Sequence, residues 1–316
     1  MTPDTGATPT VVAVGSAIRD DYLTLSNLPE PDGGAFVRER REGFGGVAAN
    51  VACALARLDR SVGMVTRLGD DGDAPAVERD LRERGVDTTR VRRGEERSTY
   101  SLVLRADGER MVITGGRAAA ALELREADWP FLRGADAVVT NAYAPDRVVQ
   151  GLVEARAAGE LEALAFDLSG PLAELRGRGT EPGTVDDAVE TCDLFVSGEV
   201  ALASYLDHHG ASGDAAPFLR ERGLTRGALT RGAEGATLVT PEEAVEVAAV
   251  DVDVVDPTGA GDAFTAGLVD AWLLEGRPAR EAGRFAAAAA ALNCTGDGAR
   301  GGLATREEVE RLVTEH

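Results

Sequence analysis

The chemistry that this chain can perform is concentrated in seven consecutive residues, 256–262, which read Asp-Pro-Thr-Gly-Ala-Gly-Asp. They lie between a β-branched, strand-like run at 250–255 and an apolar stretch at 263–274 that is expected to be helical. A glycine-rich turn at a helix start leaves backbone N–H groups unpaired, and these groups and the helix dipole attract anions. Asp262 would lie beside a bound phosphate as a candidate base, so the turn suits phosphoryl transfer to a hydroxyl. The alternative is an ordinary helix start with Thr258 as its N-cap.

A second glycine-rich segment, 43–50, precedes another predicted helix. Gly45 and Gly46 would let a sugar approach the backbone, and Asn50, one turn inside the helix, could bind its hydroxyls. Asparagine is a mediocre helix former, which favours a polar role for it. The alternative is a loop that leads into a helix with one incidental asparagine, because glycine-rich loops are common.

The balance of charged residues excludes several classes of function. The 316 residues include 33 basic and 54 acidic side chains, for a net charge of −21, and every basic residue is arginine. Such an acidic chain disfavours nucleic acid as a partner. It fits a halophilic cytoplasm, where salt screens self-repulsion, or a GC-rich genome that encodes arginine in place of lysine. Without lysine, Walker-A chemistry, the protein-kinase lysine and Schiff-base catalysis are excluded.

Cysteine usage and the lack of apolar targeting segments predict a cytoplasmic protein. Cys53, Cys192 and Cys294 are far apart in the sequence and no histidine is close to them, so no metal-binding spacing is present. Residues 1–10 show neither a basic segment nor an apolar core, so no signal peptide is expected. The longest uncharged, helix-like run, 285–295, is shorter than the about 20 residues that span a bilayer, and no membrane contact is expected.

Strand-like and helix-like segments alternate along most of the chain, which predicts an α/β fold with a mostly parallel sheet between two helical layers. The predicted strands are 11–15, 62–66, 137–140, 164–167, 194–197 and 229–230, and the predicted helices are 47–58, 74–84 and 145–158. Two segments break the alternation, a charged strand at 35–41 and a hairpin whose arms, 100–105 and 111–114, flank the turn 106–110. They predict a small β-sheet that stands off the main body. Arg105 and Arg110, beside that turn, are expected to be solvated, although they could reach a substrate carboxylate.

The two glycine-rich segments together resemble the paired signature of the ribokinase-like (PfkB) carbohydrate kinases. The order and separation of Gly45-Gly46-Asn50 and the turn 256–262 match that signature. Three lesser features also resemble the family. Asp20, after Gly15-Ser16, is similar to its first substrate-binding aspartate, and Thr230-Arg231-Gly232 with Gly235 is similar to its nucleotide-binding turn. Gly298-Ala299 is similar to its C-terminal pattern. The resemblance covers residues 11–309.

This resemblance implies one domain over 1–316, with a Rossmann-like αβα body and a small β lid built from residues 33–42 and 98–116. It implies ATP-dependent phosphorylation of a sugar hydroxyl, with Mg²⁺ entering with ATP and held largely by phosphates and water. The implied roles are a catalytic base, Asp262; an anion hole, Gly259, Ala260 and Gly261; substrate-binding residues, Asp20, Gly45, Gly46 and Asn50; nucleotide-binding residues, Ser197, Thr230, Gly232, Gly235 and Gly298; and a monovalent-cation site for K⁺, Asp256. The lid could also be shared between the subunits of a homodimer.

Departures from the family pattern leave the substrate open. Ser197 stands where the family's N-x-x-E motif has asparagine and Glu199 is displaced by one position, so the way Mg²⁺ is held is not carried over. Tyr143 replaces a glutamate of ribokinases proper, and ribose, fructose, a phosphorylated hexose and a 2-keto-3-deoxy acid all remain candidates. Tyr143 could instead form the aromatic wall of a nucleoside kinase. Another alternative is a protein that binds or senses a sugar without catalysis.

Overall fold

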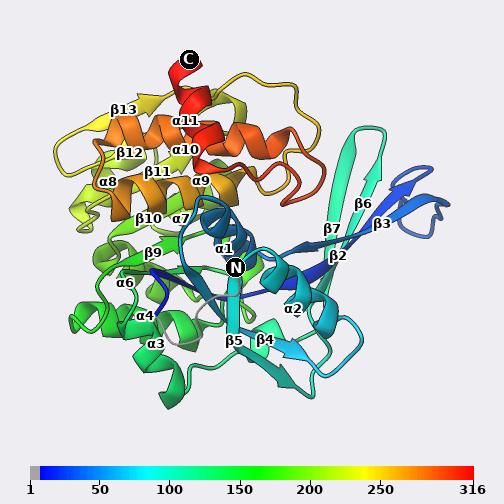
Figure 1. Ribbon diagram of the computed structural model, residues 1–316. Helices are drawn as coiled ribbons and strands as arrows, with labels where there is room; N and C mark the ends of the chain where they lie inside the picture. Colours follow the sequence, from blue (N-terminus) through cyan, green and yellow to red (C-terminus); the bar gives the residue numbers. More distant parts are fainter. Residues whose placement is uncertain (1–7) are drawn as a thin grey trace.

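A nine-stranded sheet forms the centre of the structure, a computed structural model that describes residues 8–316 (Figure 1). All neighbouring strands are parallel except β12 and β13, which add antiparallel to one edge. In spatial order the strands are β13 (Ala244–Val247), β12 (Ala236–Val239), β11 (Gly227–Thr230), β10 (Leu194–Gly198), β9 (Leu164–Asp167), β8 (Ala137–Asn141), β1 (Val11–Val14), β4 (Val62–Gly69) and β5 (Val86–Gly94). Most of the segment 1–10, for which no signal peptide is expected, lies outside the described residues.

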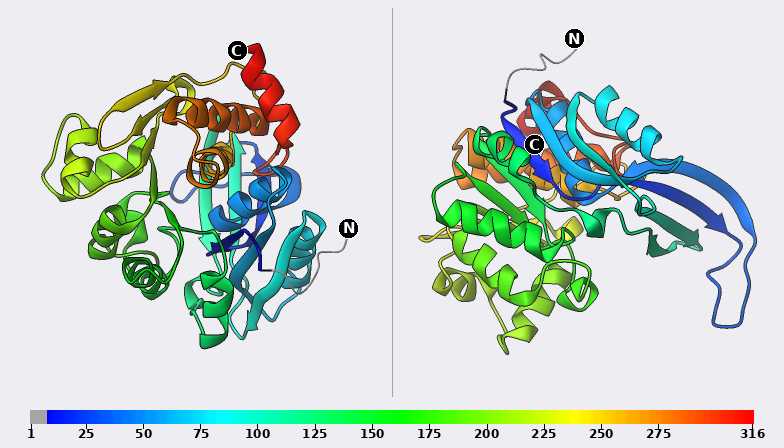
Figure 2. Two further views of the ribbon diagram at one scale, coloured as in Figure 1. Left: turned by 60° about the vertical axis from the view of Figure 1, so that its left-hand side comes forward. Right: turned by 90° about the horizontal axis from the view of Figure 1, so that it is seen from below.

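Helices cover both faces of this sheet, as the predicted αβα architecture requires (Figures 1 and 2). In β1, Val11 and Ala13 face one hydrophobic core while Val12 and Val14 face the other, so the strand reads as a continuous apolar run. The first core is closed by α1 (Val47–Arg57), α2 (Ala74–Glu83), α9 (Ala260–Leu268) with its π-helical continuation Val269–Leu274, α10 (Ala279–Cys294) and α11 (Arg306–Glu315). The second is closed by α3 (Trp129–Arg133), α4 (Asp146–Ala157), α5 (Leu172–Leu175), α6 (Pro182–Thr191), α7 (Glu199–His208) and α8 (Ala215–Glu221).

A second, four-stranded sheet projects from the body and is called the small sheet below (Figures 1 and 2). Its strands, in spatial order, are β3 (Val37–Gly45), β2 (Ile18–Leu25), β6 (Tyr100–Ala106) and β7 (Glu109–Gly115). The predicted hairpin is confirmed, because Asp107 (φ 52°) and Gly108 (φ 84°) form its two-residue turn with the positive φ that a tight hairpin needs. The sequence patterns missed β2, since Asp20 and Asp21 interrupt its apolar residues.

The predicted strand at 250–255 is wrong. This segment is an extended connection outside both sheets, and Val254 and Val255 are 60% and 62% exposed. Val250 at its start packs against the hydrophobic core, and at its end the backbone N–H groups of Val255 and Asp256 donate to the carbonyl of Cys294 at the end of α10. β-branched residues favour extended backbone whether or not a partner strand is present, so the sequence pattern does not reveal this difference.

Helices α9 and α10 pack closely because small residues line their contact. A Cβ added at Gly267 in α9 would lie 2.7 Å from the Cα of Ala286 in α10, closer than real Cβ atoms approach backbone. Ala286 begins an uninterrupted alanine run that ends at Ala291. This contact places the start of α9, where the chemistry is predicted, against the body of the protein. No helix within residues 8–316 combines the length and apolarity needed to cross a bilayer.

Gly267→Ala is expected to destabilise the protein although alanine is the better helix former. The added methyl group would press on the α10 backbone, and such overpacking costs about 1–3 kcal/mol. Gly151 inside α4 is the matched control, because the atoms nearest to an added Cβ are 3.9 Å away. Gly151→Ala should therefore raise the free energy of unfolding by about 0.5–1 kcal/mol. Urea unfolding measures both, and equal effects would show that α9 and α10 are not in close contact.

Candidate active site

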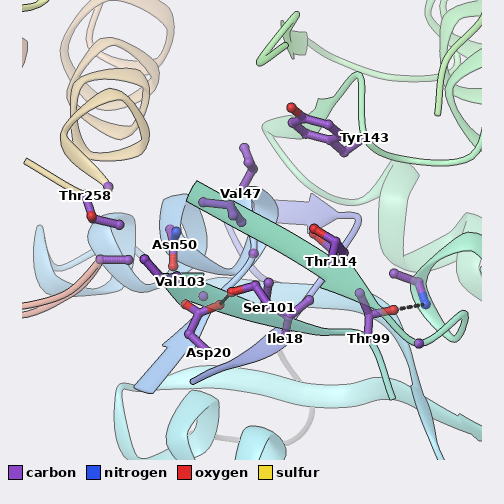
Figure 3. Close-up of a pocket in the computed structure, with 18 of the residues that line it drawn as sticks. Ile18, Asp20, Val47, Asn50, Thr99, Ser101, Val103, Thr114, Tyr143 and Thr258 are labelled. Atoms are coloured by element: carbon purple, nitrogen blue, oxygen red, sulfur yellow. Dashed lines mark hydrogen bonds between the residues drawn. The ribbon is translucent and has the colours of Figure 1, made fainter. Parts of the chain in front are cut away.

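The candidate site lies where the order of the central sheet reverses. From β1 the chain continues to β4 and β5 on one side and to β8 on the other, and ligands bind at the carboxyl ends of strands at such a point. A cavity of about 680 Å³ opens there, lined by Ser16 after β1, Tyr143 after β8 and residues of the small sheet. Figure 3 shows Tyr143 across this cavity from Asp20 and Ser101.

The four predicted substrate-binding residues, Asp20, Gly45, Gly46 and Asn50, all line this cavity. Asp20 lies on β2 and is 5% exposed, and its carboxylate accepts a hydrogen bond from the hydroxyl of Ser101 on β6. A Cβ at Gly45 would lie 2.2 Å from Asp20 Oδ2, so glycine is needed for the carboxylate to lie over the backbone. Burial of the Asp20 carboxyl raises its pKa, although the Ser101 bond opposes this.

The helix start at Gly259 differs from an ordinary capped helix. The N-cap of α9 is Gly259 itself, with φ 80° and no side-chain cap, so Thr258 does not have that role. A Cβ at Gly259 would lie 2.2 Å from the carbonyl oxygen of Ala299, so this turn requires glycine. The N–H of Ala260 donates to Pro257 O, whereas those of Gly259, Gly261 and Asp262 have no protein acceptor within residues 8–316.

Asp262 is held by a buried chain of hydrogen bonds that ends at an arginine. The Nδ2 of Asn50 donates to Asp262 Oδ2 at 2.7 Å, and the Oδ1 of Asn50 accepts from Arg300 Nε at 2.7 Å. Arg300 is 5% exposed and also donates to Gly45 O, at 2.8 Å, and to the carboxylate of Asp80. Because Arg300 can only donate, it fixes the Asn50 amide with its nitrogen toward Asp262.

Asp262 has the pKa of a base that works near neutral pH. Burial of the carboxyl raises the pKa of Asp262 to about 7, the bond from Asn50 and the Arg300 charge lower it, and the nearby carboxylates of Asp167 and Asp20 raise it further. A general base is most effective when its pKa lies near the working pH. The site therefore brings together a tuned carboxylate, unpaired amides and a cavity large enough for a sugar.

Asp256, predicted to hold a monovalent cation, already has a cationic partner. Arg105 NH2 donates to Asp256 Oδ2 at 2.8 Å, and the backbone amides of Thr258 and Gly298 complete its hydrogen bonds. Burial opposes ionisation, yet the Arg105 bond and these amides hold the pKa of Asp256 well below its ordinary value. Arg110 donates to the Thr258 hydroxyl at 3.0 Å. The expectation of solvation is therefore wrong for Arg105, which is half-buried, whereas Arg110 is exposed as expected and still reaches Thr258.

The predicted nucleotide-binding residues fall into two places. Ser197 lies one residue before the end of β10 and Thr230 ends the adjacent parallel strand β11. Gly232 and Gly235 bound the single turn of 3₁₀ helix that follows β11. Gly298 lies elsewhere, with its amide on Asp256. Within residues 8–316 no three acidic, histidine or cysteine side chains form a metal cluster.

The sequence analysis did not identify three residues that belong to the site: Ser101, Arg105 and Arg300. Each acts on a predicted site residue that is far away in the chain, and Arg300 and Asn50 are separated by 250 positions. No local pattern marks Ser101 or Arg105. Only Arg300 could have been identified as a candidate site residue from the sequence, because it directly follows the Gly298-Ala299 pair that resembles the family's C-terminal pattern.

Comparisons with known proteins find relatives along nearly the whole chain. Residues 8–306 match the model of the pfkB family of carbohydrate kinases. The chain is 33% identical over 296 residues to an ATP-dependent ribose-1-phosphate kinase of Halopiger xanaduensis, which covers 92% of this chain and 93% of that protein. It is 26% identical over 313 residues to a nucleoside kinase of Methanothermobacter thermautotrophicus, covering 96% of each. The solved structure of Arabidopsis thaliana ribokinase complexed with ribose and ATP is similar, with a TM-score of 0.83, 26% identity and coverage of 97% and 99% of the two chains.

Arg300→Met is expected to raise the pKa of Asp262 above about 7. Loss of Arg300 removes a positive charge and frees the Asn50 amide, and both changes favour the protonated carboxyl. If Asp262 must be ionised to act, the acidic limb of the pH–rate profile should move to higher pH. Arg84→Met is the matched control, because Arg84 also bonds Asp80 but does not contact Asn50. An unchanged profile in Arg300→Met, or an equal shift in both variants, would contradict this positioning role.

Proposed function

The chain belongs to the PfkB family of carbohydrate kinases, and we propose that it transfers the γ-phosphoryl group of ATP to a hydroxyl of a small sugar or sugar derivative bound in the cavity. The observation that carries this proposal is the position of Asp262. Its carboxylate lies at the start of α9 beside unpaired backbone amides, in a cavity lined by Asp20, Gly45 and Asn50.

Separate groups of this chain would bind the substrate, accept its proton and stabilise the transferring phosphoryl group. Asp20 and Asn50 would bind substrate hydroxyls, and Asp262 would accept the proton of the hydroxyl that attacks phosphorus. The unpaired amides at the start of α9 would stabilise negative charge on the transferring group, where the helix dipole adds to their effect. Mg²⁺, bound with ATP, would neutralise charge on the phosphates. The small sheet forms one wall of the cavity and would keep water from the phosphoryl group.

The lining of the cavity favours a substrate that carries a negative charge. Arg110, Arg117 and Arg178 line it although the chain as a whole has a net charge of −21. A phosphorylated sugar would suit these side chains, because guanidinium groups bind phosphate well. The Halopiger xanaduensis relative, whose substrate is named as ribose 1-phosphate, is consistent with this choice.

A nucleoside kinase is the second candidate, because Tyr143 gives the cavity an aromatic wall. A coupled assay for ADP with ribose 1-phosphate, ribose, fructose, a phosphorylated hexose, a 2-keto-3-deoxy acid and nucleosides would separate the candidates. Turnover of a nucleoside but of no sugar would select the second. Ligand binding without turnover of any compound would instead support a non-catalytic sugar-binding protein.

Asp262→Asn should lower turnover by about 10²–10⁴-fold while leaving substrate affinity within about tenfold, since a base acts mainly in the transition state. The variant should also be more stable than the native protein at pH 8. The folded pKa of Asp262, about 7, lies above its ordinary value of 3.8, so the charged carboxyl costs stability progressively as pH rises between these values. Thermal unfolding at pH 5 and pH 8 measures this. Near-normal turnover in a correctly folded Asp262→Asn variant would remove Asp262 from its proposed role.

We also propose a homodimer formed through the small sheet. Phe36 is 83% exposed, and Met111 and Ile113, on the unpaired edge strand β7, are each 51% exposed. Large exposed apolar side chains and free strand edges are typical of contact surfaces. Ile113→Asp should therefore convert a dimer into a monomer in light-scattering measurements, whereas Val200→Asp, which changes another exposed apolar residue on α7, should not. A native monomer at micromolar concentration would contradict the dimer.

A further inference from the structure

We infer that Arg105 is a tethered replacement for a monovalent cation at Asp256, so that the transfer reaction does not depend on K⁺. This inference rests on the proposed function, because it concerns the turn that forms the anion hole. The argument starts from the carboxylate of Asp256, whose side chain is only 1% exposed. A charged group buried to that extent needs a counterion.

Three of the about four acceptor sites of the Asp256 carboxylate are occupied by groups of the protein. Its Oδ1 accepts from the amide of Thr258 at 3.0 Å, and its Oδ2 accepts from Arg105 NH2 at 2.8 Å and from the amide of Gly298 at 2.9 Å. Arg105 is the only cationic side chain in ion-pair contact with this carboxylate within residues 8–316. The guanidinium lies 2.8 Å from Oδ2 of Asp256, and it would repel a second cation bound to the same carboxylate. The residues present therefore do not fit a K⁺ site.

Through these bonds Asp256 joins the turn that contains the proposed anion hole to the loop that contains Gly298. It joins Thr258, at the start of the turn, to Gly298, which precedes the Ala299 carbonyl packed against Gly259. Loss of the counterion would leave a buried negative charge beside the position of the transferring phosphoryl group. Such a charge would repel the phosphates and loosen the turn, and both effects would slow the reaction.

The position of Arg105 on the small sheet gives this counterion a further property. Arg105 lies on β6, opposite Arg110 on β7, and both contact the turn at Asp256 and Thr258. Arg41 of β3 pairs with Asp297 at 2.7 Å in the neighbouring loop. The small sheet thus supplies positive charge to the turn at 256–258 from outside the body. Any displacement of this sheet that separates Arg105 from Asp256 removes the counterion. The anion hole can therefore stabilise the transferring group only when the small sheet lies against the turn.

The first test uses the native protein and needs no variant. Initial rates with ATP and the substrate found in the screen are measured in KCl, NaCl and choline chloride at equal ionic strength. Equal rates in the three salts are expected, because a cation with no site of its own cannot shift the reaction. The midpoint of thermal unfolding should also be the same in the three salts. A rate or a midpoint that rises specifically in KCl would overturn the inference.

The second test asks whether the charge of Arg105 is what matters. Arg105→Ala should lower the rate in choline chloride by about 100-fold, and millimolar guanidinium or KCl should restore part of it. Arg38→Ala is the matched control, since Arg38 is an exposed arginine of the same sheet, on β3. KCl should raise the unfolding midpoint of Arg105→Ala more than choline chloride does. An Arg105→Ala protein with the native rate in choline chloride would contradict the role of Arg105. If no substrate is turned over, the proposed function fails, while the unfolding midpoints still test the cation site.

Discussion

The hydrogen bond from Asn50 to Asp262 is the contact on which the arrangement of the site depends. It spans 2.7 Å and joins residues that are 212 positions apart, one on α1 and the other on α9. It sets the direction of the carboxylate and limits how far burial raises its pKa. Arg300 keeps the bond in place, because it occupies the carbonyl side of the same amide. A buried polar chain of this kind is favourable only when every member has its partner, and this one continues to Asp80 on α2.

The absence of lysine shapes these contacts. A guanidinium presents several donors in a plane and can hold several acceptors at once, whereas an ammonium acts as a compact point charge. Arg300 uses this property to bond Asn50, Asp80 and Gly45 together. Arg105 similarly reaches both Asp256 and the Thr258 hydroxyl. In a chain with a net charge of −21, these forked donors gather carboxylates and carbonyls that would otherwise repel one another.

The sequence predicted those features of the fold and the site that depend on residues close together in the chain. The alternation of strands and helices gave the parallel sheet, and the glycine-rich turns placed Asn50 and Asp262 at the starts of two helices that the fold brings together. The roles of Arg300 and Arg105 could not be predicted, because their partners are distant in the chain and any surface arginine has the same local signature. Strand β2 was missed because its buried aspartate, Asp20, looks like a loop residue until the cavity is known. The run 250–255 was wrongly predicted to be a strand because it is β-branched, although Val254 and Val255 are exposed and the segment pairs with neither sheet.

The small sheet cannot be exchanged between proteins as an independent unit. The chain enters and leaves it twice, through the hairpins β2–β3 and β6–β7, and positive-φ glycines stand at Gly46 and Gly116 where it returns to the body. A chimera that exchanged only one hairpin would separate Asp20 from Ser101. A chimera that exchanged both hairpins but kept its own turn at 256–258 would leave Asp256 facing either a differently placed arginine or no arginine. In the function proposed above, the small sheet thus contributes both to substrate binding, through Asp20, and to the anion hole, through Arg105, and a transplant of the sheet would alter both at once.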